Sequence, residues 1–355
     1  MSAIGQGTPF VSVIVPCRNE AAYIGACLDS ILQSRYPIDR LELLVADGRS
    51  DDGTRAIVER YAARHPQHVR LLDNPERIVP TALNRGIRAA RGDVIARMDA
   101  HVAYPPEYLP ALVTALRETG ADNVGGPVVT RPARPGPVTQ AIAIALSHPF
   151  GVGNSYFRIG GGSDRRWVDT VPFGCWPRAV FDRVGLFDEE LVRNQDDEFN
   201  HRLLHRGGRV LLEPRARSIY YARASLPQLA RMYYQYGYYK PLVARKVGAI
   251  MTLRQLVPGV FVAGLLGATA LAPFWSPAAW CAGGIAVSYA GLVAACAGLA
   301  GRRHGLRCVA ALAAAFMVLH VSYGSGFWRG VWDHWVRRRS GGGPLTDPAA
   351  IPLSR

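Results

Sequence analysis

The amino-acid sequence predicts an α/β domain with a mostly parallel sheet, followed by helices that cross a membrane. Two observations carry this prediction. Strand-like apolar runs alternate with helix-like segments in the first part of the chain, and the composition changes abruptly after Arg254. Such alternation is typical of βαβ units, in which helices cover both faces of a parallel sheet. The 355 residues are enough for one large domain or two ordinary ones.

Four short runs of aliphatic and β-branched residues are the expected strands. They are FVSVIVP, LELLVAD, HVRLLD and DVIARMD, at residues 10–16, 41–47, 68–73 and 93–99. The segments between them have helical period and cover residues 20–33, 53–64 and 80–92. We therefore expect these strands to lie in one sheet that is flanked by the intervening helices.

The composition narrows the classes of function. Hydrophobic residues make up 49 % of the chain, so a sizeable core is expected, and the formal net charge is +14. This charge suits a membrane surface or anionic substrates, and no RNP-like, zinc-finger or helix-turn-helix pattern supports a nucleic-acid partner. The six cysteines show no CxxC spacing, and the start MSAIGQGTPF does not resemble a signal peptide. We expect the catalytic part to be cytosolic.

Three uncharged apolar stretches follow Arg254. They cover residues 256–275, 278–300 and 308–328, and none contains Lys, Arg, Asp or Glu. Their length matches the hydrocarbon thickness of a bilayer, which is about 30 Å. Buried core helices are the alternative interpretation, but three such stretches in succession favour a membrane domain. The expected organisation is a catalytic domain at 1–245, a membrane domain at 246–335, and a basic, flexible tail at 336–355.

The third apolar stretch leaves the membrane topology open. Basic residues precede the first stretch and separate the second from the third, so both sets face the cytosol if the first two stretches form a hairpin. A full third span would then place the basic sequence VRRRS outside, against the positive-inside rule. The third segment is therefore expected to be spanning, re-entrant or interfacial.

Polar motifs follow three of the expected strands: PCRNE at 16–20, DGRSDDGT at 47–54 and DAH at 99–101. In an open parallel sheet, ligands bind beyond the carboxyl ends of the strands. The carboxylate of Asp99 and the imidazole of His101 are acceptable ligands for a divalent metal, and histidine shifts the preference from Mg²⁺ towards Mn²⁺. Two ligands hold such an ion weakly, so the pattern indicates a metal that binds together with a substrate diphosphate.

These motifs, in this order, resemble the signature of family 2 glycosyltransferases with the GT-A fold. The resemblance rests on VSVIVPCRNE, DGRSDDGT, ALNRGIRAARGDVIARMDAH and NQDDEFNHRLLHRGGRV, and it covers roughly residues 10–240. The chain resembles more closely the membrane-bound glucosyltransferases of the succinoglycan biosynthesis type. This closer resemblance rests on the motifs RMDAH, VDTVPFGC and LVRNQDDEFNHRL. The resemblance implies a GT-A catalytic domain that uses a nucleotide sugar.

The resemblance also implies roles for single residues. The nucleotide-sugar site would consist of Pro16, Arg18, Glu20, Asp47, Asn84 and Asp99, with Asp47 on the uracil ring. Asp99 and His101 occupy the positions of the family's DxD motif and would bind the metal. Since histidine replaces the usual last aspartate, the choice between Mn²⁺ and Mg²⁺ stays open.

The resemblance aligns Asp196 with the family's catalytic base, and Asp197, Glu198 and Arg202 are acceptor-site candidates. An inverting transfer needs one base to take the proton of the acceptor hydroxyl, and the charge of the leaving diphosphate must be compensated. The alternative for Asp196 is a structural carboxylate at a helix N-terminus.

The expected function is inverting, metal-dependent transfer of a hexose, with UDP-glucose as the expected donor. The expected acceptor is a polyprenyl-diphosphate-linked saccharide at a bacterial-type inner membrane, in the biosynthesis of exopolysaccharide or of a cell-surface glycan. The alternatives are a polyprenyl-phosphate glycosyl synthase, a processive polysaccharide synthase, and a membrane sensor that binds a nucleotide sugar without turnover. The processive alternative is disfavoured because the segment around Gln235 lacks the QxxRW pattern.

Overall fold

The computed structural model describes residues 7–160, 162–248 and 252–337, and these residues form two compact units. The first unit comprises residues up to 129 and residues 160–220, and the second comprises residues 130–159 and those from 221 onwards. The region predicted as the catalytic domain, 1–245, therefore contributes to both units. The tail predicted at 336–355 lies outside the described residues from 338 onwards.

An eight-stranded sheet forms the centre of the first unit, in the order β3-β2-β1-β4-β9-β6-β10-β8. Its strands are β1 (Val11–Cys17), β2 (Leu41–Asp47), β3 (Val69–Asp73), β4 (Val94–Arg97), β6 (Asn123–Gly125), β8 (Arg166–Val168), β9 (Cys175–Pro177) and β10 (Val210–Leu212). β1 pairs in parallel with β2 and β4, and β2 pairs in parallel with β3. Only β9 and β8 run antiparallel to their neighbours in this sheet. The mostly parallel sheet predicted from the sequence is confirmed.

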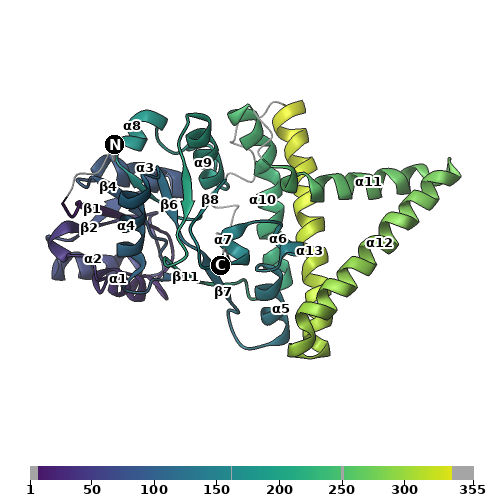
Figure 1. Ribbon diagram of the computed structural model, residues 1–355, viewed down its shortest axis with the longest axis horizontal. Helices are drawn as coiled ribbons and strands as arrows, with labels where there is room; N and C mark the ends of the chain where they lie inside the picture. Colours follow the sequence, from purple (N-terminus) through teal and green to yellow (C-terminus); the bar gives the residue numbers. More distant parts are fainter. Residues whose placement is uncertain (1–6, 161, 249–251, 338–355) are drawn as a thin grey trace. The chain divides into compact units, whose positions relative to one another are not determined.

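Helices flank this sheet in the first unit (Figure 1). They are α1 (Ile24–Leu32), α2 (Thr54–Arg64), α3 (Val79–Ala89), α4 (Tyr108–Thr119), α8 (Ala179–Val184) and α9 (Gln195–His205), with a 3₁₀ turn at Ile38–Arg40. α3 packs closely on β1, because a Cβ atom at Gly86 would lie 2.5 Å from Cγ2 of Ile14. A small second sheet, in the order β5-β11-β7, consists of β5 (Val102–Ala103), β11 (Ser218–Tyr221) and β7 (Val128–Arg131).

An aromatic cluster anchors α9 to the sheet. The ring of Trp176 in β9 lies 5.7 Å from the ring of Phe181 in α8 and 5.8 Å from the ring of Phe199 in α9, measured between centroids. Phe187 stacks on Phe199 with a centroid distance of 4.6 Å. Such aromatic pairs add to the stabilisation that their buried area already provides. The cluster fixes the position of α9, whose first turn carries Asp196.

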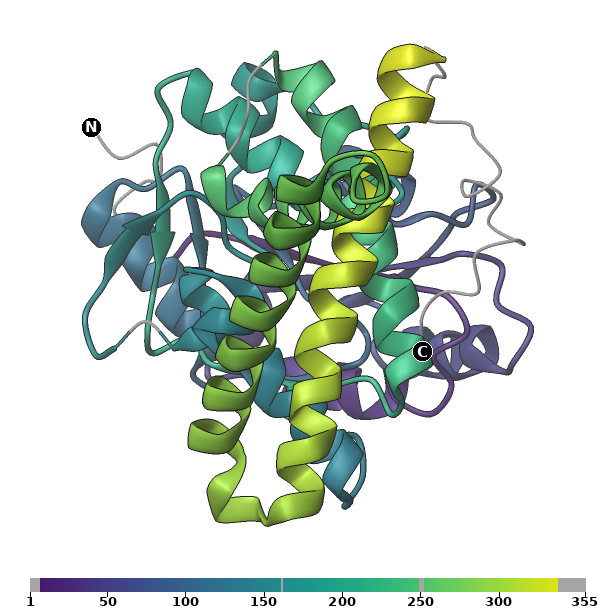
Figure 2. The ribbon, with the colours of Figure 1, turned by 90° about the vertical axis from the view of Figure 1, so that its right-hand side faces the viewer.

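The second unit is helical. It contains α5 (Pro137–Ala145), α6 (Pro149–Val152), α7 (Tyr156–Ile159), α10 (Leu226–Val247), α11 (Val257–Leu271), α12 (Ser276–Gly301) and α13 (Leu306–Val331), with short turns at Leu253–Gln255 and Arg302–His304 and a π-helical turn at Trp332–Val336. Figure 2 shows α12 and α13 side by side.

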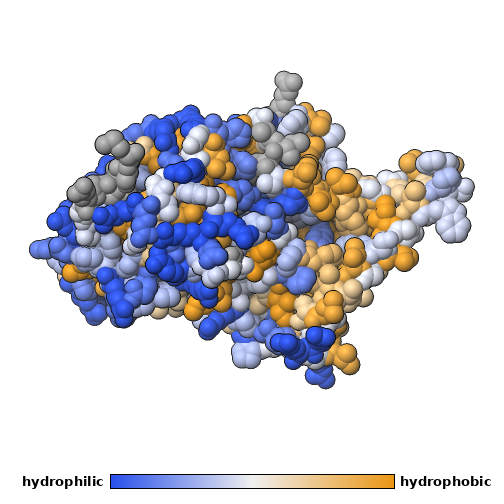
Figure 3. Space-filling view, viewed as in Figure 1, coloured by the Kyte–Doolittle hydropathy of each residue, from blue (hydrophilic) through white to orange (hydrophobic). Residues whose placement is uncertain are grey.

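Among the described residues, three helical stretches are long and apolar enough to cross a membrane: Leu253–Leu271, Ser276–His304 and Leu306–Val336. Hydrophobic side chains gather over these helices (Figure 3).

Candidate active site

The polar motifs of the sequence emerge at one edge of the sheet. β1, β2 and β4 are parallel neighbours, and Cys17 at the end of β1 is paired in register with Asp47 at the end of β2. β4 ends at Arg97, so the loop that follows it leaves the same edge. The carboxyl ends of parallel strands are where α/β folds bind ligands. The predicted convergence of the three motifs is therefore present.

Hydrogen bonds tie the loop after β1 to the loop after β2. The backbone N–H of Asn19 donates to Oγ of Ser50 at 2.8 Å, and the backbone N–H of Asp51 donates to Oδ1 of Asn19 at 3.0 Å. The backbone N–H of Glu20 donates to Oγ1 of Thr54 at 2.7 Å. These bonds fix two strand-end loops as one body. The sequence analysis had singled out neither Asn19 nor Ser50 for this contact.

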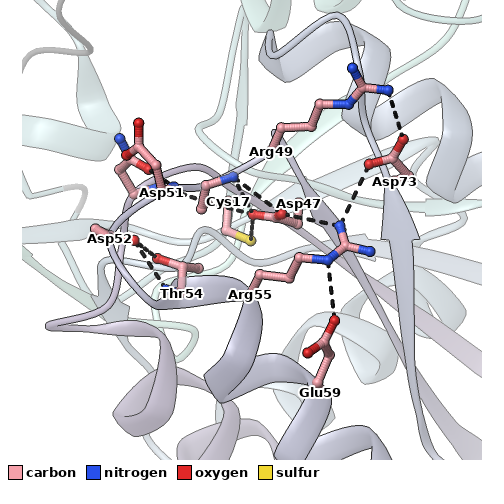
Figure 4. Close-up of polar contacts among 11 residues, drawn as sticks. Cys17, Asp47, Arg49, Asp51, Asp52, Thr54, Arg55, Glu59 and Asp73 are labelled. Carbon is pink, nitrogen blue, oxygen red and sulfur yellow. Dashed lines mark hydrogen bonds and ion pairs between the residues drawn. The ribbon is translucent and has the colours of Figure 1, made fainter.

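Asp47 is fully buried and shapes its own loop (Figure 4). Its Oδ1 accepts a bond of 2.5 Å from Oγ of Ser50, and the backbone N–H of Ser50 lies 3.3 and 3.4 Å from the two carboxylate oxygens. Nη1 of Arg55, on α2, lies 3.5 Å from Oδ2. Asp47 therefore has a structural role in this arrangement, and its predicted contact with uracil stays a prediction.

The loops after β1 and β4 meet through Glu20 and His101. Nδ1 of His101 lies 3.4 Å from Oε1 of Glu20, and the imidazole is more exposed than the carboxylate. Pro16 is a buried residue of β1, and Arg18 follows at half-buried depth beside the backbone of Gly48. Of the residues predicted to line the nucleotide from this loop, Glu20 thus lies beside the DxH motif.

Arg97 joins the two carboxylates that the sequence analysis assigned to different roles. Its side chain is only 5 % exposed. Nε and Nη2 donate to the two oxygens of Asp99 at 2.7 and 3.0 Å, and Nη1 donates to Oδ1 of Asp196 at 2.5 Å. The guanidinium also lies 5.9 Å from the ring centre of Phe173. One buried cation thus fixes the candidate metal-site carboxylate relative to the candidate base.

The sequence analysis missed this role of Arg97. The available signal was an arginine in the apolar strand DVIARMD, two residues before Asp99. A buried arginine needs an anionic partner, and Asp99 was the nearest carboxylate in the sequence. Its second partner, Asp196, is 99 residues away in the chain, and only the fold brings the two together.

The same environment sets the pKa of Asp196. Burial raises the pKa of this carboxyl group to about 6, against the opposing effect of Arg97, and the charges of Asp99 and Asp197 add to the increase. A general base works best when its pKa lies near the working pH. Asp196 therefore has the properties of a base that is ionised at neutral pH yet still able to accept a proton.

Asp196 and Asp197 lie in the first turn of α9, which follows Asn194 in the left-handed conformation. No side chain at that N-cap position accepts a bond from the helix. The position is favourable for a carboxylate, because helix N-termini carry a partial positive charge.

Glu198 and Arg202, two of the predicted acceptor-site residues, bind each other one turn apart at 2.7 and 2.8 Å. Arg202 also donates to the backbone carbonyls of Val184 and Leu186 at 2.7 and 2.8 Å. These contacts fasten α9 to the segment after α8. They are those of a structural pair, and the predicted acceptor-side roles of Asp197, Glu198 and Arg202 stay predictions.

Asn84, predicted to lie over the nucleotide, is buried and fastens α3 to a distant loop. Its side-chain N–H donates to the carbonyl of Phe187 at 2.9 Å and to Oε1 of Glu189 at 2.7 Å, and its Oδ1 accepts from the backbone N–H of Phe187 at 2.9 Å. The side-chain amide of Asn84 thus both donates to and accepts from the backbone of Phe187. The contacts give no support to a direct role at the nucleotide.

The donor groups around the DxH motif fit a divalent metal that binds together with a diphosphate. Asp99, His101 and Glu20 offer carboxylate and imidazole ligands, and a carboxylate oxygen that accepts one bond from Arg97 keeps a further lone pair. Among the described residues, no group of three or more His, Cys, Asp or Glu side chains is arranged to hold a metal alone. Phosphate oxygens would have to complete the coordination shell, as they commonly do for Mg²⁺.

The polar residues at the ends of neighbouring parallel strands lie where open α/β proteins bind their ligands. The model of the family described as glycosyl transferase family 2 matches residues 12–186. The chain is 33 % identical over 335 residues to the succinoglycan biosynthesis protein ExoA of Rhizobium meliloti, covering 92 % of this chain and 96 % of that protein. The chain belongs to glycosyltransferase family 2 and is a glycosyltransferase.

Two further proteins are similar over much of the chain. One is a dolichyl N-acetyl-alpha-D-glucosaminyl phosphate 3-beta-D-2,3-diacetamido-2,3-dideoxy-beta-D-glucuronosyltransferase of Methanococcus voltae, 28 % identical over 67 % of this chain and 74 % of that protein. The other is the mannosyltransferase PcManGT of Pyrobaculum calidifontis, solved with GDP-Man and Mn²⁺. It superposes with a TM-score of 0.54 at 22 % identity, covering 92 % of this chain and 88 % of that one. This likeness confirms the GT-A-like fold.

Proposed function

We propose that this glycosyltransferase transfers a hexose from a UDP-sugar to a polyprenyl-diphosphate-linked saccharide. The transfer is inverting and metal-dependent, and the proposed donor is UDP-glucose. The observation that carries the proposal is the link through Arg97. It fixes Asp99, at the position that would meet the metal and the donor, relative to Asp196, at the position that would meet the acceptor. A donor-side carboxylate and a candidate base are thereby held in one rigid arrangement.

In the proposed reaction, Asp196 accepts the proton of the acceptor hydroxyl while the hydroxyl oxygen attacks the anomeric carbon in line. The new glycosidic bond forms as the bond between that carbon and the diphosphate oxygen breaks, and the configuration inverts. A divalent metal held by Asp99 and His101 would neutralise charge on the leaving diphosphate. Arg97 keeps Asp196 oriented, and the raised pKa of Asp196 suits proton acceptance.

The lipid-linked acceptor is supported by two features. The Methanococcus voltae relative is named for a dolichyl-phosphate-linked sugar, which is a lipid-linked acceptor. This chain has helical stretches apolar enough to reach the bilayer in which such an acceptor resides. We place the catalytic unit on the cytosolic side of a bacterial-type inner membrane, with exopolysaccharide or cell-surface glycan biosynthesis as the setting.

The test uses the full chain purified in detergent. It is supplied with Mn²⁺ or Mg²⁺, a panel of UDP-sugars with GDP-mannose as a further donor, and a polyprenyl-diphosphate-linked saccharide. Asp196→Asn is compared with Asp197→Asn, a matched control that removes the same charge one residue away. We expect metal-dependent transfer from UDP-glucose, lost in Asp196→Asn and reduced much less in Asp197→Asn, because Asp197 would contact the acceptor without taking its proton.

Other outcomes of this assay would revise distinct parts of the proposal. Transfer from GDP-mannose alone would overturn the donor assignment. Transfer to polyprenyl phosphate but not to the diphosphate-linked saccharide would favour the polyprenyl-phosphate glycosyl synthase. Equal activity of Asp196→Asn and wild type would remove Asp196 as the base.

A further inference from the structure

Helices α10 and α13 of the second unit form a tightly packed parallel pair (Figures 1 and 2). The hydroxyl of Tyr238, on α10, donates to Oδ2 of Asp333 just beyond α13 at 3.2 Å. Three residues further along α10, the carbonyl of Pro241 accepts a bond of 3.0 Å from Nε1 of Trp335. The guanidinium of Arg245 donates to the carbonyl of His334. The partner advances from Asp333 at Tyr238 to Trp335 at Pro241, so the two helices run in the same direction.

Glycines bring the two backbones into direct contact. A Cβ atom at Gly237 of α10 would overlap the carbonyl oxygen of Tyr323. Cβ atoms at Gly326 and Gly330 of α13 would likewise overlap carbonyl oxygens of α10. Gly326 and Gly330 are four residues apart, the spacing at which small residues allow helices to approach closely. The pair therefore behaves as a single element, and α13 takes the same position relative to a bilayer as α10.

The composition of α10 excludes it from the hydrocarbon region. Within its 22 residues it carries Arg231, Lys240, Arg245 and Lys246, and it is not among the stretches long and apolar enough to span. Charged side chains are strongly disfavoured in the centre of a bilayer. A spanning α13 would carry this helix into the membrane with it.

The other two apolar helices differ from α13 in burial. In the stretches that contain α11 and α12, 11 % of the most apolar 18 residues are buried in the protein. In the stretch that contains α13, 33 % of the most apolar 18 residues are buried. Between Val257 and Gly301 the sequence has no Lys, Arg, Asp or Glu, and large side chains such as Leu266 and Trp280 are exposed. Hydrocarbon is the medium in which such surfaces are stable.

The outward side of the end of α13 and of the π-helical turn after it has the character of an interfacial surface. Trp328, Trp332 and Trp335 recur at helical spacing and are each about half exposed. Tryptophan side chains concentrate at the membrane–water interface. The indole N–H groups of Trp328 and Trp335 donate to the carbonyls of Gly259 and Pro241, so the apolar ring faces are what these two residues offer to the interface. On the inward side, Asp333 is buried and pairs with Arg329 at 2.8 Å.

We propose that the hairpin of α11 and α12 is the membrane-inserted part of this chain, and that α13 lies with α10 at the membrane surface without crossing. Its inner stripe and the indole N–H of Trp335 bind α10, and the exposed parts of the three tryptophan rings face the lipid headgroups. This arrangement places the arginines at 302, 303 and 307 on the same side as those of α10, in agreement with the positive-inside rule. Both ends of the chain then lie on one side of the membrane.

The test determines on which side of a bacterial inner membrane the two ends of the full chain lie. Green fluorescent protein and alkaline phosphatase are fused separately to the C-terminus and to the N-terminus. Alkaline phosphatase is active only where its disulfides form, outside the cytosol. We expect fluorescent, phosphatase-inactive fusions at both ends, irrespective of whether the chain proves to be a glucosyltransferase.

The matched control inserts one additional membrane-spanning helix between the chain and the C-terminal reporter. The proposal expects this insertion to invert both signals, with loss of fluorescence and gain of phosphatase activity. Phosphatase activity at the C-terminus without the inserted helix, together with fluorescence at the N-terminus, would show that α13 crosses and would overturn the proposal.

Discussion

Two carboxylate sites at the same sheet edge are held by arginines of very different exposure. Asp47 lies 3.5 Å from Arg55, whose side chain is 42 % exposed, and most of its bonds come from Ser50 in its own loop. Asp99 and Asp196 share Arg97, whose side chain is only 5 % exposed. An exposed ion pair is screened by water and contributes little, whereas a buried one fixes geometry and cannot lose one partner without a large penalty.

This difference indicates a division of labour. The Asp47 region consists of the loop after β2 and the loop after β1 that is bonded to it, and it shapes the expected nucleotide site. The Arg97 region joins residues from β4 and α9, so it couples the donor side of the expected reaction to the acceptor side. We therefore expect changes near Asp47 to affect binding, and changes near Arg97 to affect turnover.

Of the two arginines, the larger effect is expected at Arg97. Lysine in its place has one ammonium group and cannot hold two carboxylates in a forked geometry. We expect Arg97→Lys to lower kcat by about 100-fold with little change in nucleotide affinity, as expected for a residue that positions a general base. Steady-state kinetics and calorimetric UDP binding measure the two quantities. An equal loss in both would remove the proposed link to the base.

Arg97→Ala tests the structural side of the same contact. It leaves the partly buried carboxylates of Asp99 and Asp196 without their cation. Breaking a fully buried pair costs about 3–5 kcal/mol, and partial exposure of the two carboxylates lowers this cost. Thermal unfolding of the two variants should therefore show a much larger decrease in melting temperature for Arg97→Ala than for Arg97→Lys. Equal melting temperatures would indicate that the guanidinium does not stabilise the site.

A smaller effect is expected at Asp47. Asparagine keeps the shape but removes the charge that accepts the bonds of Ser50, and hydrogen bonds to a charged group contribute about 1.5–3 kcal/mol. We expect Asp47→Asn to weaken UDP binding by about 10-fold or more, because 1.4 kcal/mol corresponds to a factor of ten. Titration calorimetry measures this, and unchanged affinity would contradict a role of this loop in nucleotide binding.

The pH dependence should report Asp196. The base must be ionised, and its pKa is raised to about 6, so activity is retained above that pH and falls as the pH decreases through it. At one unit below the pKa, kcat/KM should be about 10-fold below its plateau, since about one tenth of the groups stay ionised. Rates measured from pH 5 to 8 test this. A profile that is flat over this range would contradict the role of Asp196.

The smallest effect is expected at Arg55. Its pair with Asp47 is partly exposed, and such pairs contribute about 0.2–1 kcal/mol. Arg55→Ala should therefore change UDP affinity by less than about fivefold. A loss as large as that of Asp47→Asn would show that the exposed arginine, and not the loop around Ser50, holds the carboxylate.

Much of the fold could be predicted because its signals are local. The apolar runs that became β1 to β4 and the uncharged stretches that became α11 to α13 are each visible within about 20 residues. The convergence of the strand-end motifs followed from the geometry of parallel sheets. The antiparallel strands β8 and β9 are only three residues long, too short to give a periodic pattern.

The contacts of the site residues were harder to predict because they join distant parts of the chain. Asn84 bonds to Phe187, 103 residues away, and nothing in its own segment distinguishes a buried amide from a solvated one. Glu198 and Arg202 have the spacing of any helical ion pair, so the sequence did not reveal that they fasten α9. Arg97 needed both of its partners to be placed before its role became visible.

The account is tested most directly by measuring UDP affinity and maximal turnover side by side for Asp196→Asn and Asp47→Asn. The account predicts opposite patterns. Asp196→Asn should keep UDP affinity and lose about 10²–10⁴-fold in turnover, the usual contribution of a general base. Asp47→Asn should lose affinity and keep most of its turnover at saturating donor. If both variants lose affinity and turnover in the same proportion, the proposed division of labour between the two regions is wrong.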